Sequence, residues 1–443
     1  MRILFIFGTG SEVRQFLHSG IISNLVNSGN HIFISSKQTV CDEIKKANTE
    51  VIELPWYSMS YPSGLLSRIS KILDLSFEKK YNFKTWRYNN KEIRNNSIYN
   101  IISSFTVFRP VYYFLEFIER KLQRSNYVVS DEWVALLRKH KIDRIVVNSP
   151  RNYQAILFAA QYLKIPVLVL YHTNKDIYAQ GRINFRFYKY GVWNKEMANE
   201  LLYYNPFIKR NEVEIIGCSH FSYLSDYSLI MEYKEFVFKF NIDAKNDFLV
   251  LYTASGPGII PNENKYIDDI RESLLNAGIN KYKIIIRTNP MDFTDQWTDE
   301  NHDDIIIVKP QWHYDPIGFF NFTKQEDLKE FSTLLRYCNV CINIPSTVTI
   351  ECAIAQVPVI NICYNNELNK GADILRFWNA PFYKNVLKFN AAIPVFSKNE
   401  LKDILILINN GLNLKLSQKL YLQNEIGVDI KKITSVNCKF ILS

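Results

Sequence analysis

Apolar and polar positions alternate along the start of the chain in the rhythm of a βαβ unit. The apolar run of residues 2–7 predicts a buried strand, which ends at the turn 8–10 with its two glycines. Residues 11–29 carry apolar side chains at helical spacing and end on a glycine, and residues 31–36 form a second apolar run. A strand, a glycine turn, a helix and a strand in this order predict a parallel sheet.

The same rhythm returns along the rest of the chain. The apolar runs 142–149 and 166–172 flank a helix predicted at 153–163, which repeats the unit. A second series follows, with strands predicted at 248–255, 281–290, 303–310, 340–344 and 357–364 and helices between them. The fold class that follows is α/β, with two Rossmann-like doubly wound domains in tandem.

The length of the chain supports this division, because 443 residues exceed what one ordinary core holds. We expect an N-terminal domain at 1–235 and a C-terminal domain at 245–443, with the polar stretch 225–247 as the link. The last helices, at 398–425, are expected to complete the second domain or to cross back to the first.

Residues 55–135 interrupt the first series with an aromatic, basic and largely helical stretch. One interpretation is a packed helical insertion that is interrupted at Pro110. The other is a surface that meets a membrane or a lipid-linked acceptor, because Arg109, Arg120 and Lys121 lie among its apolar positions. The sequence leaves both interpretations open.

Charge and cysteine content narrow the classes of partner. The 53 Lys and Arg against 44 Asp and Glu give a net charge of +9 in short runs, which suits an acidic small ligand or an anionic membrane surface better than nucleic acid. Seven scattered cysteines, of which only Cys338 and Cys341 have CxxC spacing, predict buried thiols in a reducing cytoplasm and no metal site. The sequence has no run of 18 apolar residues and no signal-peptide pattern, so we expect a cytoplasmic protein, free or peripheral to the inner face of the cell membrane.

The stretch 343–360 carries the most informative candidate site. Ser346 and Thr347 follow a predicted strand and begin the next helix, whose free N–H groups and dipole attract an anion such as a diphosphate. Glu351 lies one helical turn further along the same face, where a carboxylate can accept hydrogen bonds from ribose hydroxyls. The alternative is that Ser346 only caps the helix and that Glu351 is a solvated helix residue.

Two other strand ends of the second series extend this candidate site. Arg287 lies at the end of a strand, and its planar guanidinium matches phosphate oxygens, although an ordinary surface arginine explains it equally. Ser255 and Gly256 follow the strand that opens the series. A glycine there lets the backbone approach a ligand closely, or it only makes a turn.

The first series holds a second group of candidates. Gly8 and Gly10 form only a GxG, so a full dinucleotide fingerprint is missing, and both are expected to contact the nucleotide sugar. Glu12 begins the following helix, where it is either a general base for an acceptor hydroxyl or an acid placed well against the helix dipole. His172 and Asp176 follow a later strand and are further catalytic candidates, against the alternative of a loop histidine with satisfied hydrogen bonds.

These residues resemble those of GT-B glycosyltransferases, in which two Rossmann-like domains face a central cleft and the second domain holds most of the nucleotide sugar. The stretch PSTVTIECAIAQVPVI is similar to the donor-site element of that superfamily, and the match implies phosphate contacts for Ser346 and Thr347 and a ribose contact for Glu351. A narrower likeness to bacterial surface-polysaccharide transferases, including the CDP-glycerol glycerophosphotransferase-like group, rests on VWNKEMANELL, LYTASGPGIIPNE and IIIRTNP. Asn289 departs from this pattern, because many relatives have a histidine there.

The resemblance implies a metal-independent glycosyltransferase that moves a sugar from a nucleotide-sugar donor to a hydroxyl of a bacterial surface glycan. The expected partners are the donor, a glycan or lipid-linked glycan acceptor and an anionic membrane surface, and no cofactor, metal or nucleic acid is expected. Three alternatives stay open: a polyol-phosphate transferase that uses a CDP-alcohol, a nucleotide-sugar 2-epimerase, and a non-catalytic binding subunit of the same fold. The insertion at 55–135 counts against the epimerase, because a second, larger substrate gives it a purpose.

Overall fold

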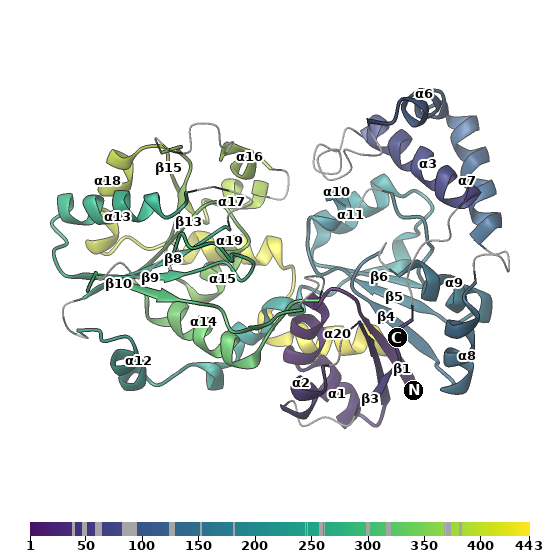
Figure 1. Cartoon of the computed structure of the whole chain (residues 1–443), viewed down its shortest axis with the longest axis horizontal. Coiled ribbons are helices and arrows are strands. Elements are labelled where there is room, and N and C mark those ends of the chain that lie inside the picture. The colour runs from purple at the N-terminus through teal and green to yellow at the C-terminus, as the bar shows by residue number, and fades with distance from the viewer. Residues whose placement is uncertain are drawn as a thin grey trace. The chain divides into compact units, whose positions relative to one another are not determined.

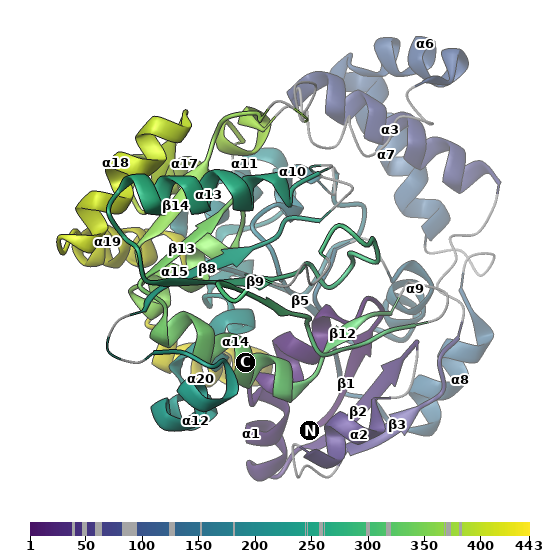
Figure 2. The ribbon, with the colours of Figure 1, turned by 60° about the vertical axis from the view of Figure 1, so that its left-hand side comes forward.

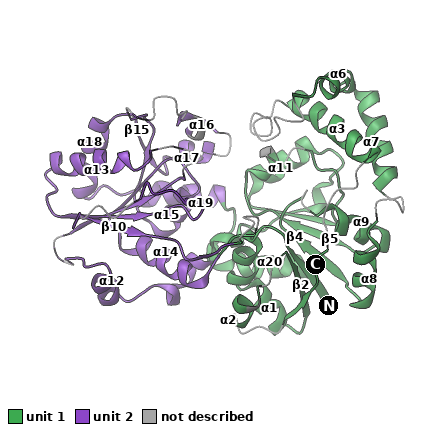
Figure 3. Cartoon of the chain, in the orientation of Figure 1, with its two compact units in different colours: residues 1–222, 315–322, 426–443 green, residues 223–314, 323–425 purple. Residues whose placement is uncertain are grey.

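The structure is a computed structural model in which the chain forms two compact units (Figure 3). Unit 1 comprises residues 1–222, 315–322 and 426–443, and unit 2 comprises residues 223–314 and 323–425. The chain therefore passes from unit 1 to unit 2 after Ser222, whereas the boundary expected from the sequence lies between residues 235 and 245. The structure describes the whole chain apart from residues 38–39, 47–50, 58–63, 82–94, 124–128, 151–152, 180–181, 244, 246, 257–259, 261, 298–301, 316–319, 367, 369–373 and 381–382.

Unit 1 is built on a parallel sheet of seven strands in the order β3-β2-β1-β4-β5-β6-β7. The strands are β1 (Arg2–Phe7), β2 (His31–Ser36), β3 (Val51–Leu54), β4 (Arg144–Val147), β5 (Val167–Leu170), β6 (Lys189–Val192) and β7 (Val213–Ile215). Helices cover both faces, which explains why most of these strands are continuous apolar runs and not alternating patterns. The α/β class expected from the sequence is confirmed for this unit.

The helices of unit 1 form two layers around the sheet (Figure 1). A π-helical turn (Val13–His18), α1 (Ile21–Asn27), α2 (Cys41–Lys46) and α20 (Ile433–Leu442) lie on one face, and α8 (Asp131–Lys139) and α9 (Gln154–Leu163) lie on the other. The short α10 (Asp176–Ala179) and α11 (Lys195–Tyr204) follow β5 and β6. The helix expected over 11–29 is thus two pieces, because Gly20 takes a positive φ of 76° between them.

A separate helical layer projects from unit 1 in both views of the chain (Figures 1 and 2). It consists of α3 (Leu65–Tyr81), α6 (Ser97–Thr106) and α7 (Arg109–Gln123), all inside the insertion expected at 55–135. The axes of α6 and α7 differ by 112°, and Pro110 lies in the first turn of α7, where a proline is tolerated. No single helix in the described part of the chain is long and apolar enough to cross a bilayer, although α6 and α7 together meet that criterion by length and composition.

Unit 2 is built on a parallel sheet of six strands in the order β10-β9-β8-β13-β14-β15. The strands are β8 (Phe248–Thr253), β9 (Tyr282–Arg287), β10 (Ile305–Val308), β13 (Val340–Asn343), β14 (Val359–Ile362) and β15 (Ile393–Val395); β11 (Trp312–His313) and β12 (Phe322–Thr323) are shorter. The helices are α13 (Lys265–Asn276), α14 (Gln325–Tyr337), α15 (Val348–Ala355), α16 (Leu375–Trp378), α17 (Lys384–Phe389), α18 (Lys398–Asn409) and α19 (Lys415–Glu425). Two Rossmann-like domains are therefore confirmed.

The stretch expected as a link, 225–247, is a packed part of unit 2, and that expectation is wrong. It contains α12 (Tyr233–Lys239), which packs on α14 through the rings of Tyr233 and Tyr337, with centroids 5.0 Å apart. Phe236 is fully buried in the same contact, which is why a short helix with lysines on its exposed side stays attached. At the other end of the chain, α18 and α19 belong to unit 2, whereas α20 belongs to unit 1.

The six cysteines other than Cys41 are free thiols, and five of them are buried. Cys338 and Cys341 are among the buried ones, and burial raises the pKa of the Cys338 thiol well above its usual value. Within the described residues, no group of three His, Cys, Asp or Glu side chains could hold a metal ion.

Candidate functional site

Each sheet reverses its strand order at one point, and that point locates the candidate sites. The reversal lies between β1 and β4 in unit 1 and between β8 and β13 in unit 2. In sheets of this kind, ligands bind beyond the carboxyl ends of the two strands that flank the reversal. The strand ends are in register there, since Asn343 of β13 lies beside Thr253 of β8.

Four of the expected nucleotide-sugar contacts flank the reversal in unit 2. Ser255 and Gly256 follow the end of β8, and Ser346 and Thr347 follow the end of β13. The sequence showed only that both pairs come after strands. Their position on the two sides of one reversal is a result of the strand order, and it makes them a common candidate site.

The start of α15 is capped by Ser346. The Val348 N–H donates to Ser346 Oγ at 3.3 Å, and the Asn343 side-chain amide donates to the same oxygen at 3.3 Å. Thr347 takes a helical conformation and is exposed, so its hydroxyl is open to a ligand. The capping interpretation of Ser346 is therefore observed, and the phosphate contact of both hydroxyls stays a prediction.

Glu351 is buried, so the interpretation as a solvated helix residue is wrong. Its side chain is 5% exposed, and its Oε1 accepts a hydrogen bond from the Tyr223 hydroxyl at 2.9 Å. Tyr223 is also buried and comes from the beginning of unit 2, 128 residues earlier in the chain. The tyrosine fixes the orientation of the carboxylate, and the expected ribose contact of Glu351 stays a prediction.

Ser255 and Gly256 form an anion-binding turn, and a carboxylate of the protein itself fills it. The fully buried Glu263 accepts the Ser255 N–H at 2.9 and 3.0 Å, the Ser255 hydroxyl at 2.8 Å and the Gly256 N–H at 3.3 Å. The hydroxyl of Tyr252 donates to its other oxygen at 2.9 Å. Burial raises the pKa of Glu263 to about 7, although the donors from Ser255, Tyr252 and Gly256 favour the charged form.

Sequence reasoning missed Glu263, because an acid shortly before a helix is common and nothing in the chain shows that it folds back eight residues. Asn289, the position that departs from the family pattern, supports the same turn by donating to the Ser255 carbonyl at 3.0 Å. Gly256 has a φ of 101°, and a Cβ there would lie 3.1 Å from Asn289 Cγ. The turn therefore requires its glycine for conformation as well as for space.

Arg287 is held in a buried ion pair. Its Nη2 donates to Asp327 at 2.7 Å, and its guanidinium lies 4.6 Å from the centroid of the Phe331 ring. Asp327 is itself buried, so the pair is structural. Nη1 is buried and has no hydrogen-bond partner among the residues that the structure describes. The interpretation as an ordinary surface arginine is wrong, and the phosphate contact stays a prediction.

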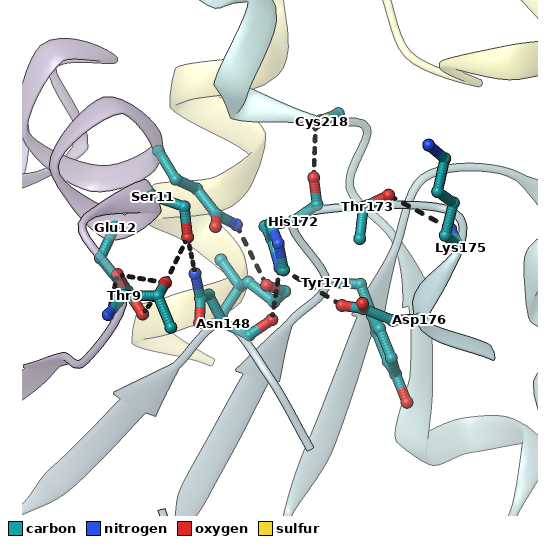
Figure 4. A network of polar contacts seen from close by, with 12 residues as sticks. Thr9, Ser11, Glu12, Asn148, Tyr171, His172, Thr173, Lys175, Asp176 and Cys218 are labelled. Carbon is teal, nitrogen blue, oxygen red and sulfur yellow. Dashed lines mark hydrogen bonds and ion pairs between the residues drawn. The ribbon is translucent and has the colours of Figure 1, made fainter. Parts of the chain in front are cut away.

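In unit 1, a buried polar network connects the two strands at the reversal (Figure 4). Glu12, which is fully buried, accepts the Thr9 N–H at 3.2 Å, the Thr9 hydroxyl at 3.0 Å and the Tyr153 hydroxyl. Asn148 follows β4 and donates to Ser11 at 2.9 Å. Tyr153 also lies 3.0 Å from Asn148 Oδ1, and burial raises the pKa of Tyr153 well above its usual value. Glu12 is thus a member of this network and not only a charge at a helix start.

The two glycines of the GxG are required by packing within unit 1. A Cβ on Gly8 would lie 2.6 Å from the Tyr153 ring, so the glycine makes room for the tyrosine that reaches Glu12. Gly10 has a φ of 80°, and a Cβ on it would collide with the Asn321 carbonyl. The expected contacts of Gly8 and Gly10 with a nucleotide sugar stay predictions, and the structure gives both glycines another reason.

His172 and Asp176 form an ion pair just beyond β5 (Figure 4). The His172 Nδ1 lies 3.3 Å from Asp176 Oδ2. Burial opposes a charge on the ring, but Asp176 and Glu12 outweigh it and raise the pKa of His172 to about 9. The imidazole is therefore cationic at neutral pH, which fits a proton donor or an anion ligand better than the base expected from the sequence.

A second histidine in unit 1, His220, has the opposite character. Burial, the Arg14 guanidinium and the charge of His172 lower the pKa of His220 well below its usual value, so its ring is neutral. Its Nδ1 is buried without a hydrogen-bond partner among the described residues. Because the pKa of one imidazole is raised and that of the other is lowered, a protonated and a neutral histidine are available at the same pH. Sequence reasoning missed His220, because the burial and the two cations, Arg14 and His172, that lower its pKa come from distant parts of the chain.

Comparison with known proteins identifies the fold. No protein-family model matches the chain, and no curated protein matches its sequence. The solved UDP-GlcNAc 2-epimerase from Neisseria meningitidis bound to UDP-GlcNAc matches over 100% of both chains, with a TM-score of 0.58 and 14% identity. A glycosyltransferase from Rickettsia africae matches over 100% of this chain and 98% of its own, with a TM-score of 0.51 and 11% identity. HepE of Anabaena in complex with UDP matches over 100% of both chains, with a TM-score of 0.51 and 10% identity. The chain therefore has the GT-B-like, two-domain fold that these epimerases and glycosyltransferases share.

Proposed function

We propose that the chain is an enzyme that binds a nucleotide sugar through unit 2 and transfers the sugar to an acceptor hydroxyl. The observation that carries the proposal is the convergence of Ser255, Gly256, Ser346 and Thr347 on the one strand reversal of unit 2. The similar Neisseria meningitidis epimerase structure contains UDP-GlcNAc and the Anabaena HepE structure contains UDP, which favours a uridine nucleotide. Because a fold alone does not determine a reaction, the argument rests on the site.

The donor site is proposed from groups that favour anions. The positive end of the α15 dipole and the exposed Thr347 hydroxyl would hold a diphosphate. The turn of Ser255 and Gly256 is occupied by the Glu263 carboxyl group, and a phosphate oxygen would take the same N–H groups only in its place. Glu351 would accept hydrogen bonds from the ribose, in the orientation that Tyr223 sets.

The acid–base groups are proposed from unit 1. The neutral His220 would accept the proton of the acceptor hydroxyl while the acceptor oxygen forms a bond to the anomeric carbon of the sugar. The bond from that carbon to the phosphate breaks, and the electron pair leaves with the nucleoside diphosphate. The cationic His172 is the candidate proton donor or anion ligand of unit 1.

Nucleotide-sugar 2-epimerisation is the second candidate, and the comparisons favour it. Several similar solved structures are UDP-GlcNAc 2-epimerases. Such a reaction needs one group to remove a proton from the sugar carbon and another to return it, and the two histidines with opposed pKa values suit that requirement as well.

Turnover measurements separate the candidates. The protein is incubated with UDP-sugars and CDP-glycerol, with and without a glycan acceptor, and the released nucleotide and the configuration of the sugar are followed by NMR. Transfer predicts nucleotide release that depends on the acceptor. Inversion of the sugar at C2 without an acceptor would establish the epimerase instead. Nucleotide release from CDP-glycerol and from none of the UDP-sugars would establish the polyol-phosphate transferase. Nucleotide binding without turnover of any substrate would leave a binding subunit and overturn the enzymatic proposal.

A further inference from the structure

The helices α6 and α7 of unit 1 carry a concentrated exposed apolar surface, here called the α6–α7 apolar face. Several of its side chains are more exposed than buried, including Ile98 at 68%, Phe105 at 73% and Phe108 at 67%. The face consists of Ile98, Ile101, Ile102, Phe105, Val107, Phe108, Val111, Tyr113, Phe114 and Phe117. Single exposed apolar residues are ordinary, but a contiguous set on one pair of helices indicates an interaction surface.

Helix α6 buries polar side chains and exposes apolar ones, the reverse of the usual arrangement for a surface helix in water. Its buried side chains are Ser103 and Thr106, and the Lys79 ammonium of α3 donates to Ser103 Oγ at 2.7 Å and to the Asn100 carbonyl at 2.6 Å. Its isoleucines and phenylalanine point outward. A surface helix in a water-soluble domain buries its apolar stripe and exposes its polar one. The packing of α6 therefore leaves its apolar stripe for another partner.

The helix α7 shows the same reversal. Its buried side chains are Glu119 and Gln123, and Glu119 forms a two-bond ion pair with the buried Arg182, at 2.7 and 2.8 Å. Polar contacts thus attach both helices to unit 1, together with the half-buried Tyr112, Leu115, Ile118 and Leu122 of α7. This arrangement holds the face rigidly outward, because a buried two-bond pair fixes α7 in place.

The charges around the face are positive. Helix α6 contains no charged residue, and the exposed charged side chains of α7 are Arg109 and Lys121. The two acids of α7 contribute little charge to the surface. Glu119 is fully buried, and the Glu116 side chain is 16% exposed and paired with Arg120 at 3.0 Å. Within α6 and α7, the exposed charges beside this apolar surface are cations, which complement the phosphates of an anionic bilayer as the apolar side chains complement its acyl chains.

A small pocket lies beside this face, lined by residues of α3, α7 and the end of α11. Its lining includes the tyrosines Tyr81 and Tyr112 and the cations Lys80 and Arg109. Tyrosines with nearby cations are typical of the level at which lipid headgroups lie. The pocket therefore continues the apolar face on the side where the headgroups of a bilayer would be.

We propose that the α6–α7 apolar face docks unit 1 on an anionic lipid bilayer. The isoleucines and phenylalanines enter the outermost part of the acyl layer, and Arg109 and Lys121 contact lipid phosphates. The two helices, of 10 and 15 residues, are about 15 and 22 Å long, each short of the roughly 30 Å hydrocarbon core, and the 112° bend suits a segment that lies in one leaflet. A second copy of the chain is a poorer occupant, because two basic faces would meet each other. The inference does not depend on which reaction the enzyme performs.

Flotation with lipid vesicles tests this inference. The full chain is expected to float with phosphatidylcholine vesicles that contain phosphatidylglycerol, and to float less as the salt concentration rises. The double variant Phe105→Ser/Phe114→Ser should lower the partition coefficient on the order of tenfold or more, because both rings would leave the acyl layer. The matched control is Phe238→Ser/Phe293→Ser, which replaces two phenylalanines of unit 2 that are 90% and 71% exposed and should float as the wild type does.

A charge variant and a measurement of size complete the test. Arg109→Glu/Lys121→Glu should lose the preference for phosphatidylglycerol while keeping the thermal stability of the wild type, since both side chains are exposed. The inference is overturned if the wild-type chain stays in solution with anionic vesicles, or if Phe105→Ser/Phe114→Ser floats unchanged. If the wild type does not float but forms a stable dimer in light scattering, and Phe105→Ser/Phe114→Ser is a monomer, the face binds a second copy of the chain instead.

Discussion

The raised pKa of Glu263 predicts how the free energy of unfolding depends on pH. Its carboxyl is fully buried in the turn of Ser255 and Gly256, and burial raises its pKa from 4.5 to about 7. Because the folded pKa lies above the unfolded one, the stabilisation by the protonated form is complete below about pH 4.5 and is lost as the pH rises through about 7. The difference between 4.5 and about 7, at about 1.4 kcal/mol per pH unit, amounts to about 3 kcal/mol.

The substitution Glu263→Gln removes this dependence. A glutamine resembles the protonated acid, so the variant and the wild type should differ little at low pH. As the pH rises, the wild type takes up a buried charge and the variant does not. The free energy of unfolding of the wild type relative to Glu263→Gln should therefore fall by about 3 kcal/mol from about pH 4.5 to about pH 8.

Hydrogen exchange is the suitable assay, because a chain of two units need not unfold in one transition. Exchange of peptides from β8 and α13 reports the opening of the region around Glu263 without assuming a global two-state process. The exchange of β1 in unit 1 serves as an internal reference that the substitution should leave unchanged. A constant difference between wild type and Glu263→Gln across this pH range would refute the reasoning, since it would mean that the carboxyl titrates as it does in water.

Three other substitutions test particular contacts. Gly8→Ala should destabilise unit 1 by about 1–3 kcal/mol in exchange experiments, because the added methyl displaces the Tyr153 ring, whereas a stability equal to the wild type would contradict that contact. Removing the His172 charge by His172→Gln should raise the pKa of His220, so the acid limb of the pH–rate profile should move to higher pH. An unchanged acid limb would show that the charge of His172 does not affect His220. Phe236→Ala should cost about 3–5 kcal/mol and release α12 from α14, as protease cleavage near residue 236 would show; unchanged resistance would contradict its role.

Much of the fold could be predicted from the sequence, because a parallel sheet covered on both faces leaves a direct trace. The strands of β1, β8 and β13 are apolar runs that end at turn residues, and the helices between them have clear spacing. The link was misjudged because α12 is short and carries lysines on its exposed side, so its one fully buried ring, Phe236, was not visible as a core residue. The break at Gly20 was missed because apolar spacing continues across it.

The candidate site was predictable only in part, for a different reason. Ser346 and Glu351 lie in one helix start, so their common face follows from helical spacing alone. Tyr223, Glu263 and His220 reach their positions through the order of strands and the burial of distant segments. Local residue patterns give neither the strand order nor the burial of distant segments, because both depend on the whole sheet.

The central claim is that unit 2 binds a nucleotide with Glu351 on its ribose, and calorimetric titration with UDP tests it most directly. Glu351→Gln keeps an acceptor for the Tyr223 hydroxyl, so the fold should be retained while the charged hydrogen bond to the ribose is lost. Glu330→Gln is the matched control, since Glu330 is an equally buried acid of unit 2 that pairs with Lys239 on α12. The account predicts that UDP binds the wild type and the control alike, and binds Glu351→Gln about 10- to 100-fold more weakly. Equal affinity for all three proteins would remove Glu351 from the site, and no heat of binding to the wild type would contradict the nucleotide site itself.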